Sequence, residues 1–189
     1  MRLAIVVTVV IVAAVAVLAI TKGGSSDKKS AAPSQAAIEK AFAGSPPPLT
    51  ALHDDAGELL GGGTSAFKQR LSELRGHPVV VNKWAAWCGP CRQEFPVFQQ
   101  ASVRFGKRVA FIGVDSNDND GSAKGFLKKF PVTYPSYSDP NLKIAAFMDA
   151  VGAFPTTVMF DSKGKQVNTH LGPYTSEAAL AADIRRFGK

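Results

Sequence analysis

The sequence predicts an α/β domain in which a central mixed sheet is flanked by helices. Two apolar runs, at 79–84 and 109–115, have the composition of buried parallel strands, and a helix-compatible run at 92–105 separates them. This strand–helix–strand unit implies a parallel pair with a right-handed crossover. Two further strands, at 156–160 and 165–171, are separated by a short polar turn and indicate an antiparallel hairpin.

Three helices are predicted in the second half of the domain. Asp139 is followed by proline, a good helix start, so a helix is expected over 141–147. A short helix is also expected over 122–130. Thr175 or Ser176 would cap a last helix that carries an apolar stripe.

The N-terminus predicts a membrane anchor. The run from Leu3 to Ile20 is apolar except for Thr8, and as a helix it would be about 27 Å long, near the hydrocarbon thickness of a bilayer. We expect residues 1–22 to be an uncleaved single-pass anchor, with a cleaved signal peptide as the alternative. Because short N-terminal signals of this kind usually export the rest of the chain, we expect a cell-membrane protein whose C-terminal domain is extracytoplasmic.

The segment 23–48 is rich in Ser, Ala, Lys and Pro, and it predicts a flexible linker. The folded domain would then occupy 49–189. It would begin with a short hairpin around 54–57, followed by a helix capped by Thr64 or Ser65.

The net charge of +7 comes from scattered basic residues. No block of Lys and Arg interleaves with aromatic residues, which argues against nucleic-acid binding. A solvated basic surface, or one attracted to anionic lipid headgroups, accounts for the charge.

The chemistry is concentrated in the stretch Trp84-Ala85-Ala86-Trp87-Cys88-Gly89-Pro90-Cys91, which holds the only two cysteines. The first turn of a helix offers unpaired N–H groups, which lower the pKa of a thiol placed there. We expect Cys88 to be the exposed attacking sulfur and Cys91, one turn inside, to resolve the mixed disulfide. Pro90 suits the first helical turn.

Two other interpretations of the cysteine pair are weaker. A structural disulfide that closes so short a loop would stabilise the fold little. A zinc site needs about four ligands, and the sequence offers no second cysteine pair and no paired histidines. The sequence therefore predicts no metal site.

The block from Val81 to Pro96 (VNKWAAWCGPCRQEFP) resembles the active-site block of the thioredoxin superfamily. Within it, the sequence looks like the membrane-anchored, extracytoplasmic TlpA/ResA/DsbE-like proteins of bacteria, roughly from Leu52 to the C-terminus. The resemblance implies a thioredoxin-like fold with a helical insertion at 117–151 and no cofactor besides the dithiol. Its partners would be the thiols and disulfides of exported proteins and a membrane thiol relay as electron donor.

The resemblance also implies a substrate-binding surface. Phe154-Pro155 matches the family's cis-proline loop, where the backbone of Phe154 would pair with an incoming substrate strand. Trp87, Gly89 and Pro90 would contact substrate. The alternative for Pro155 is an ordinary trans proline at the start of an edge strand.

Three polar residues near the cysteines are candidate tuning groups. The family's glutamate at the position of Glu94 manages the proton of the buried thiol, and a partly buried carboxyl there would have a raised pKa. A solvent-exposed helix glutamate is the alternative. Asn82 occupies the place where ordinary thioredoxins carry a buried aspartate. Lys83 departs from the family's apolar residue: it could reach water at the strand end, pair with Glu94, or favour the thiolate of Cys88.

The predicted activity is thiol-disulfide oxidoreduction, with reduction or exchange of disulfides in exported proteins favoured. The resemblance implies service in cytochrome c maturation or in general extracytoplasmic thiol control. A disulfide-introducing oxidant is one alternative, and a non-catalytic thiol or Cu(I)-binding module is the other.

Overall fold

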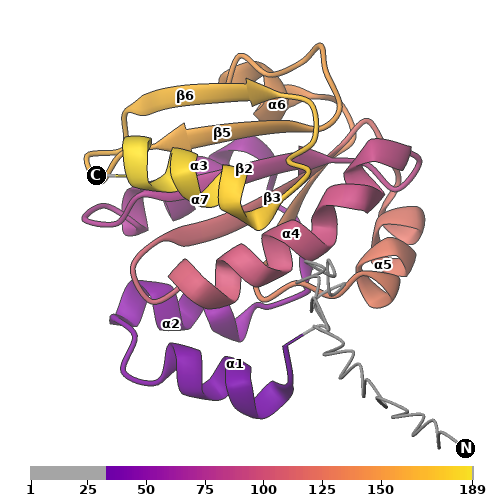
Figure 1. Ribbon diagram of the computed structural model, residues 1–189. Helices are drawn as coiled ribbons and strands as arrows, with labels where there is room; N and C mark the ends of the chain where they lie inside the picture. Colours follow the sequence, from indigo (N-terminus) through magenta and orange to yellow (C-terminus); the bar gives the residue numbers. More distant parts are fainter. Residues whose placement is uncertain (1–32, 189) are drawn as a thin grey trace, which may run out of the picture. The chain divides into compact units, whose positions relative to one another are not determined.

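A six-stranded mixed sheet, with strand order β1-β4-β3-β2-β5-β6, forms the centre of the structure, a computed structural model that describes residues 33–188 (Figure 1). Strands β1, β4, β3 and β2 are parallel, whereas β5 and β6 are antiparallel to their neighbours. The strands are β1 (Leu59–Leu60), β2 (Val79–Trp84), β3 (Ala110–Ser116), β4 (Ser136–Asp139), β5 (Thr156–Phe160) and β6 (Gln166–Leu171). The predicted mixed sheet is confirmed.

Helices cover both faces of the sheet. They are α1 (Gln35–Phe42), α2 (Pro47–Asp54), α3 (Gly63–Glu73), α4 (Gly89–Phe105), α5 (Asp120–Lys129), α6 (Lys143–Phe147) and α7 (Glu177–Phe187). Buried residues of α4, α5 and α7 share one apolar core, and those of α2, α3 and α6 share the other. Figure 1 shows α4 and α7 in front of the sheet and α3 behind it.

Strand β2 separates these two cores and contributes to both. Val80 and Trp84 belong to the core beneath α4, whereas Val79 and Val81 belong to the core beneath α3. Because successive side chains of a strand point to opposite faces, Asn82 faces α4 and its neighbour Lys83 faces the opposite layer. This alternation decides which groups lie near the cysteines.

The predicted linker is wrong where the chain is helical, at 35–42 in α1 and at 47–48 in the start of α2. The proline run begins α2 because the first turn of a helix leaves its N–H groups unpaired, so proline loses no hydrogen bond there. Leu49 and Leu52 then bury completely in the core beneath α3. The predicted anchor at 1–22, and the linker up to residue 32, lie outside the described residues. From residue 33 to 188, the helices are all too short or too polar to cross a bilayer.

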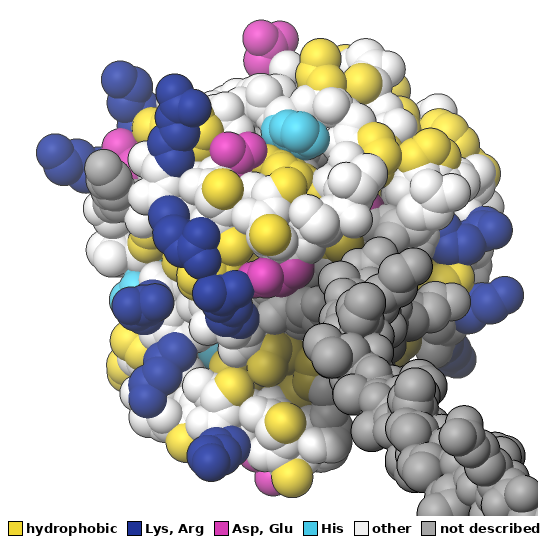
Figure 2. Space-filling view, in the orientation of Figure 1, with side chains coloured by type: hydrophobic (Ala, Val, Ile, Leu, Met, Phe, Trp, Pro, Cys, Tyr) yellow, Lys and Arg dark blue, Asp and Glu magenta, His cyan; other side chains and the backbone are white. Residues whose placement is uncertain are grey.

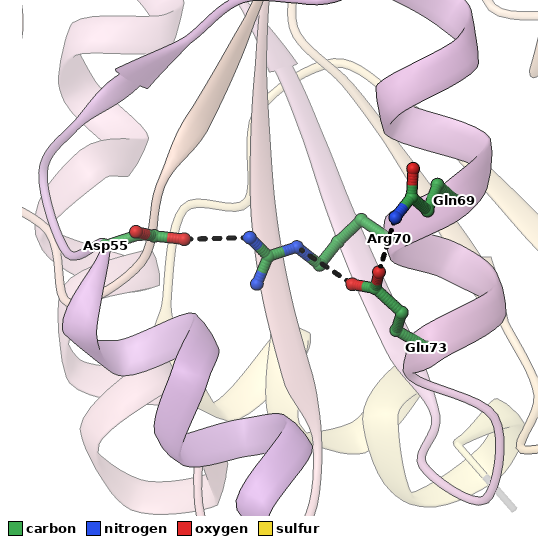
Figure 3. Close-up of polar contacts among 4 residues, drawn as sticks. All are labelled: Asp55, Gln69, Arg70 and Glu73. Carbon is green, nitrogen blue, oxygen red and sulfur yellow. Dashed lines mark hydrogen bonds and ion pairs between the residues drawn. The ribbon is translucent and has the colours of Figure 1, made fainter.

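The predicted hairpin around 54–57 is also wrong. Helix α2 ends there, and β1 pairs in parallel with β4 instead, Leu59 opposite Ser136. Arg70 of α3 reaches back to Asp55, with 2.8 Å between guanidinium and carboxylate, and also faces Glu73 (Figure 3). This ion pair ties the end of α2 to α3.

Helix α3 starts without the predicted Thr64 or Ser65 cap. Its N-cap is Gly62, whose φ of +86° is in the left-handed region. A Cβ at this position would lie 2.6 Å from that of Ala66, so only glycine fits.

The predicted helical insertion contains a strand. Strand β4 lies between α5 and α6, and its sequence, Ser-Tyr-Ser-Asp, gives no apolar strand signal. Asp139 ends β4, and its carboxylate accepts hydrogen bonds of 2.9 Å from the backbone N–H groups of Ile144 and Ala145. The predicted start of this helix is wrong: its N-cap is Leu142 and it begins at Lys143 rather than at residue 141, although Asp139 still accepts N–H groups of its first turn.

The C-terminal predictions are confirmed. Strands β5 and β6 form the antiparallel hairpin, and the Ser176 side chain accepts the first-turn N–H of Ala179 in α7. Arg185 and Arg186 lie in the last turn of α7. In the view of Figure 2, Lys and Arg side chains gather at the left of the molecule, where α7 ends.

Candidate active site

The two cysteines lie where β2 passes into α4. Trp84 ends the strand with its indole fully buried, and its Nε1–H donates to the Ser136 hydroxyl at 3.1 Å. Cys88 is the N-cap of α4, and its Sγ accepts a hydrogen bond of 3.1 Å from the backbone N–H of Cys91. The two sulfurs form a disulfide, with Cα atoms 5.3 Å apart. The predicted placement at the start of a helix is confirmed.

Cys88 is more covered than predicted, whereas Cys91 is buried as predicted. Cys88 is 3% exposed, which contradicts an openly exposed sulfur, and Cys91 is 0% exposed. The exposed residues of the motif are Trp87, Gly89 and Pro90. A partner must therefore contact these three residues to reach Cys88.

Trp87 and Phe154 form the aromatic rim of the site. Trp87 is 55% exposed, its ring centroid lies 4.9 Å from that of Phe154, and its Nε1–H donates to the Asn117 carbonyl at 2.9 Å. The Phe154–Pro155 peptide bond is cis, as predicted. This contact brings the loop before β5 beside the cysteine motif.

Glu94 lies inside the protein, so the alternative of an exposed helix glutamate is wrong. The residue is fully buried, and its Oε2 accepts a hydrogen bond of 3.2 Å from the backbone N–H of Tyr174. Burial raises the pKa of Glu94 to about 8, an effect that Tyr174 and Asn82 reduce. At neutral pH the carboxyl therefore holds a proton and can exchange it.

Other polar groups accompany Glu94 in this layer. Asn82 is fully buried and faces Thr157 across the β2–β5 pair. Buried side-chain atoms of Asn82, Thr157, Tyr134 and Glu94 Oε1 have no hydrogen-bond partner among residues 33–188. Burial and the nearby Glu94 raise the pKa of Tyr134. No sequence pattern indicates Tyr134, Thr157 or Tyr174 as site residues, because their positions depend on tertiary packing.

Lys83 is on the other face of the sheet, so its predicted pairing with Glu94 is wrong. It does not reach water either, since the residue is 0% exposed. Its Nζ donates to the Val151 carbonyl at 3.2 Å and lies 3.7 Å from the centroid of the Phe154 ring. Burial lowers the pKa of Lys83 to about 8, and Asp139 opposes this shift.

A second buried carboxyl lies behind the motif. Asp115 is opposite Trp84 in the β2–β3 pair, and burial, reinforced by Asp118 and Asp120, raises its pKa to about 8. Asp118 accepts the backbone N–H of Ala86 at 2.6 Å and so holds the loop that leads to Cys88. In the sequence, the signals for this arrangement were an aspartate at the C-terminal end of a buried strand and the polar loop that follows it.

This combination of fold and site defines a thioredoxin-like protein: a disulfide at the start of a helix, a cis-proline loop beside it, and a buried glutamate one turn along. The model of the Redoxin family matches residues 55–184, which is more than half of the chain. The chain belongs to the Redoxin family.

Relatives agree with this assignment. The chain is 31% identical over 111 residues to the thiol-disulfide oxidoreductase ResA of Bacillus cereus, covering 58% of this chain and 64% of the relative. It is 35% identical over 112 residues to a thiol:disulfide interchange protein DsbE homolog of Paracoccus denitrificans, covering 58% and 60%. The chain thus spans less than two thirds of these relatives.

A solved structure shares the fold. The crystal structure of a thiol:disulfide interchange protein DsbE candidate from Chlorobium tepidum superposes with a TM-score of 0.57 at 30% identity. The match covers 61% of this chain and 83% of that one. The shared region is therefore most of the neighbour's chain.

Proposed function

We propose that this protein is a thiol-disulfide oxidoreductase that reduces or exchanges disulfides in other proteins. The observation that carries the proposal is the Cys88–Cys91 pair at the N-terminus of α4, bordered by the cis-Pro155 loop. The names of the ResA and DsbE relatives support the same chemistry.

The reaction follows from the geometry around Cys88. In the reduced protein, the Cys88 thiolate attacks one sulfur of a substrate disulfide, and the other substrate sulfur leaves as a thiolate. The N–H of Cys91, which points at Cys88 Sγ, and the positive end of α4 favour the thiolate. Cys91 then attacks Cys88 Sγ, releases the second substrate sulfur, and leaves the disulfide seen in the structure.

Glu94 serves the second half of the reaction. Cys91 must lose a proton before it attacks, and it lies one turn before Glu94 in the same buried core. We assign the ionised form of Glu94 as the group that receives this proton. Its pKa of about 8, close to that of a thiol, leaves a minor fraction of the carboxyl ionised at neutral pH. The backbone N–H of Tyr174 holds the carboxyl, and both Tyr174 and Asn82 lower its pKa.

Insulin reduction tests the activity. We expect the unchanged chain, supplied with a small dithiol, to reduce insulin, and Cys88→Ser to abolish this activity. Cys91→Ser should instead accumulate a mixed disulfide through Cys88, so that captured partners can be identified. Equal activity of the unchanged chain and Cys88→Ser would refute the proposal and favour a non-catalytic thiol module.

The direction we propose is reductive. The Gly89-Pro90 dipeptide resembles that of reducing thioredoxins. A glutathione titration separates the alternatives: a potential near about −270 mV is expected for a reductant and near about −120 mV for an oxidant. A value near the latter would make disulfide introduction the function.

We also propose an extracytoplasmic site of action at the cell membrane, supported by the apolar run from Leu3 to Ile20. A membrane thiol relay would then return electrons to the dithiol, and exported proteins, including those of cytochrome c maturation, would be substrates. The test is alkylation of reduced Cys88 in intact cells by a reagent that cannot cross the cytoplasmic membrane. Protection of Cys88 until that membrane is opened would refute the location.

A further inference from the structure

Lys83 contacts both ends of the segment that precedes the cis-proline. Its Nζ donates to the backbone carbonyl of Val151 at 3.2 Å and lies over the ring of Phe154, 3.7 Å from the centroid. The side chain is entirely buried. A buried ammonium destabilises the fold unless its charge has interaction partners. For Lys83 these partners are the Val151 carbonyl and the Phe154 ring.

We propose that Lys83 is a positioning residue that fixes residues 151–155 in the shape that receives a protein substrate. The inference rests on the proposed oxidoreductase function and deepens it. Lys83 would act on substrate recognition rather than on the sulfurs, because it projects to the opposite face of β2 from Asn82 and Glu94.

The contacts connect Lys83 to the exposed part of the site. Above the ammonium, the Phe154 ring packs on Trp87, which is next to Cys88. Val151 is exposed, as is Trp87, so the outer side of this segment is open to a partner. A shift of the Phe154 ring would therefore change the surface that a substrate meets.

A neighbouring residue of β5 supports the same segment. Thr156, the cross-strand partner of Lys83, donates its hydroxyl to the Ala153 carbonyl at 2.7 Å. Two adjacent side chains thus hold the carbonyls of residues 151 and 153. Asp139, at the end of β4, favours the charged form of Lys83, whose pKa of about 8 leaves it mainly cationic at pH 7.

The test compares two substrates in Lys83→Met, which keeps much of the apolar volume but removes the donor and the charge. For insulin we expect KM to rise about tenfold, because substrate binding must then also order residues 151–155. For hydroxyethyl disulfide, which is too small to engage residues 151–155, we expect unchanged turnover. The reduction potential should also stay unchanged.

The matched control is Lys68→Met. The Lys68 ammonium lies 4.5 Å from the centroid of the Phe147 ring, but Lys68 is exposed and belongs to α3, away from the cysteines. It loses the same kind of contact and should leave both substrates unaffected. Lys83→Gln, which keeps a donor for the Val151 carbonyl, should give an intermediate KM and carries the test if the methionine variant does not fold.

The outcomes separate the two levels of the proposal. Absence of Cys88-dependent turnover by the unchanged chain would overturn the oxidoreductase function and this inference with it. An unchanged insulin KM in Lys83→Met, an equal loss on both substrates, or a shifted reduction potential would overturn the role of Lys83 alone.

Discussion

Glu94 lies in an environment that is unusual for a carboxyl. Its side chain has one hydrogen bond, to the backbone of Tyr174, and its other oxygen has no partner in the part of the chain that the structure describes. Such a group is retained at a cost in stability. The cost is consistent with a site that must hold a proton near neutral pH and release it.

Replacement of this carboxyl should change how stability depends on pH. The folded-state pKa of Glu94, about 8, lies above its ordinary value of 4.5. Between these values the unfolded chain loses a proton that the folded chain keeps, so Glu94 lowers the free energy of unfolding progressively as pH rises. Relative to Glu94→Gln, the oxidised protein should lose on the order of a few kcal/mol between pH 4.5 and 8.

The measurement is urea unfolding of both oxidised proteins at several pH values. Asp115, whose pKa is raised in the same direction, is present in both proteins and cancels in the comparison. A constant difference in unfolding free energy across this range would contradict the prediction.

Helix α6 shows how a single side chain can hold an element in place. It is the shortest of the helices between residues 33 and 188, and the buried carboxylate of Asp139 accepts two of its first-turn N–H groups and the hydroxyl of Ser116. Removal of the Asp139 carboxylate would leave all three donors without their acceptor. The residue also ends β4, so it joins a strand to the next helix.

Asp139→Ala should destabilise the protein by roughly 2–4 kcal/mol, because several buried donors lose their partner. Ser176→Ala, which removes the exposed cap of α7, is the control and should cost only about 1 kcal/mol. Chemical denaturation of the two variants gives the comparison. Equal losses would mean that the Asp139 carboxylate contributes no more than an ordinary helix cap.

The elements that the sequence predicted well are those with local apolar patterns, such as β2, α4 and the β5–β6 hairpin. Strand β4 was missed because Ser-Tyr-Ser-Asp has no strand signal of its own and pairs only because β3 lies beside it. Helix α2 was not predicted because a proline run is typical of a stiff linker. The burial of Leu49 and Leu52, which stabilises the helix, depends on tertiary packing.

The candidate site was predicted to a similar extent. The cysteine motif and the cis-Pro155 loop were accessible because they are contiguous in sequence. Tyr174 was not, since it reaches Glu94 from a loop that lies 80 residues away. Side chains alternate between the two faces of a strand, so Lys83 must lie on the face opposite Asn82. This alternation excludes a pairing of Lys83 with Glu94.

At the scale of the described domain, helix α2 belongs to the folded unit and α1 does not contribute to its core. Leu49 and Leu52 of α2 are fully buried, whereas no residue of α1 is. Helix α2 begins at Pro47, two residues before the predicted boundary at residue 49. Parts of the chain that precede the family match thus contribute to stability.

Leu52→Ala should cost about 2–5 kcal/mol of unfolding free energy, as expected for a buried leucine. Ile38→Ala in α1, which is only partly buried, is the matched control and should cost less than about 1 kcal/mol. Thermal and urea unfolding would measure both variants. A small effect of Leu52→Ala would place α2 outside the cooperative unit.

Strand β2 carries Asn82 and Lys83 as consecutive residues that face opposite layers. Deletion of one residue upstream in this strand would reverse both orientations: the ammonium would enter the layer of Glu94, and the carboxamide would face the opposite layer, at the place that Val81 now occupies. The register of β2 therefore affects both of the proposed roles: proton transfer near Cys91 and the shape of residues 151–155. An insertion or deletion in β2 would thus change both roles at once.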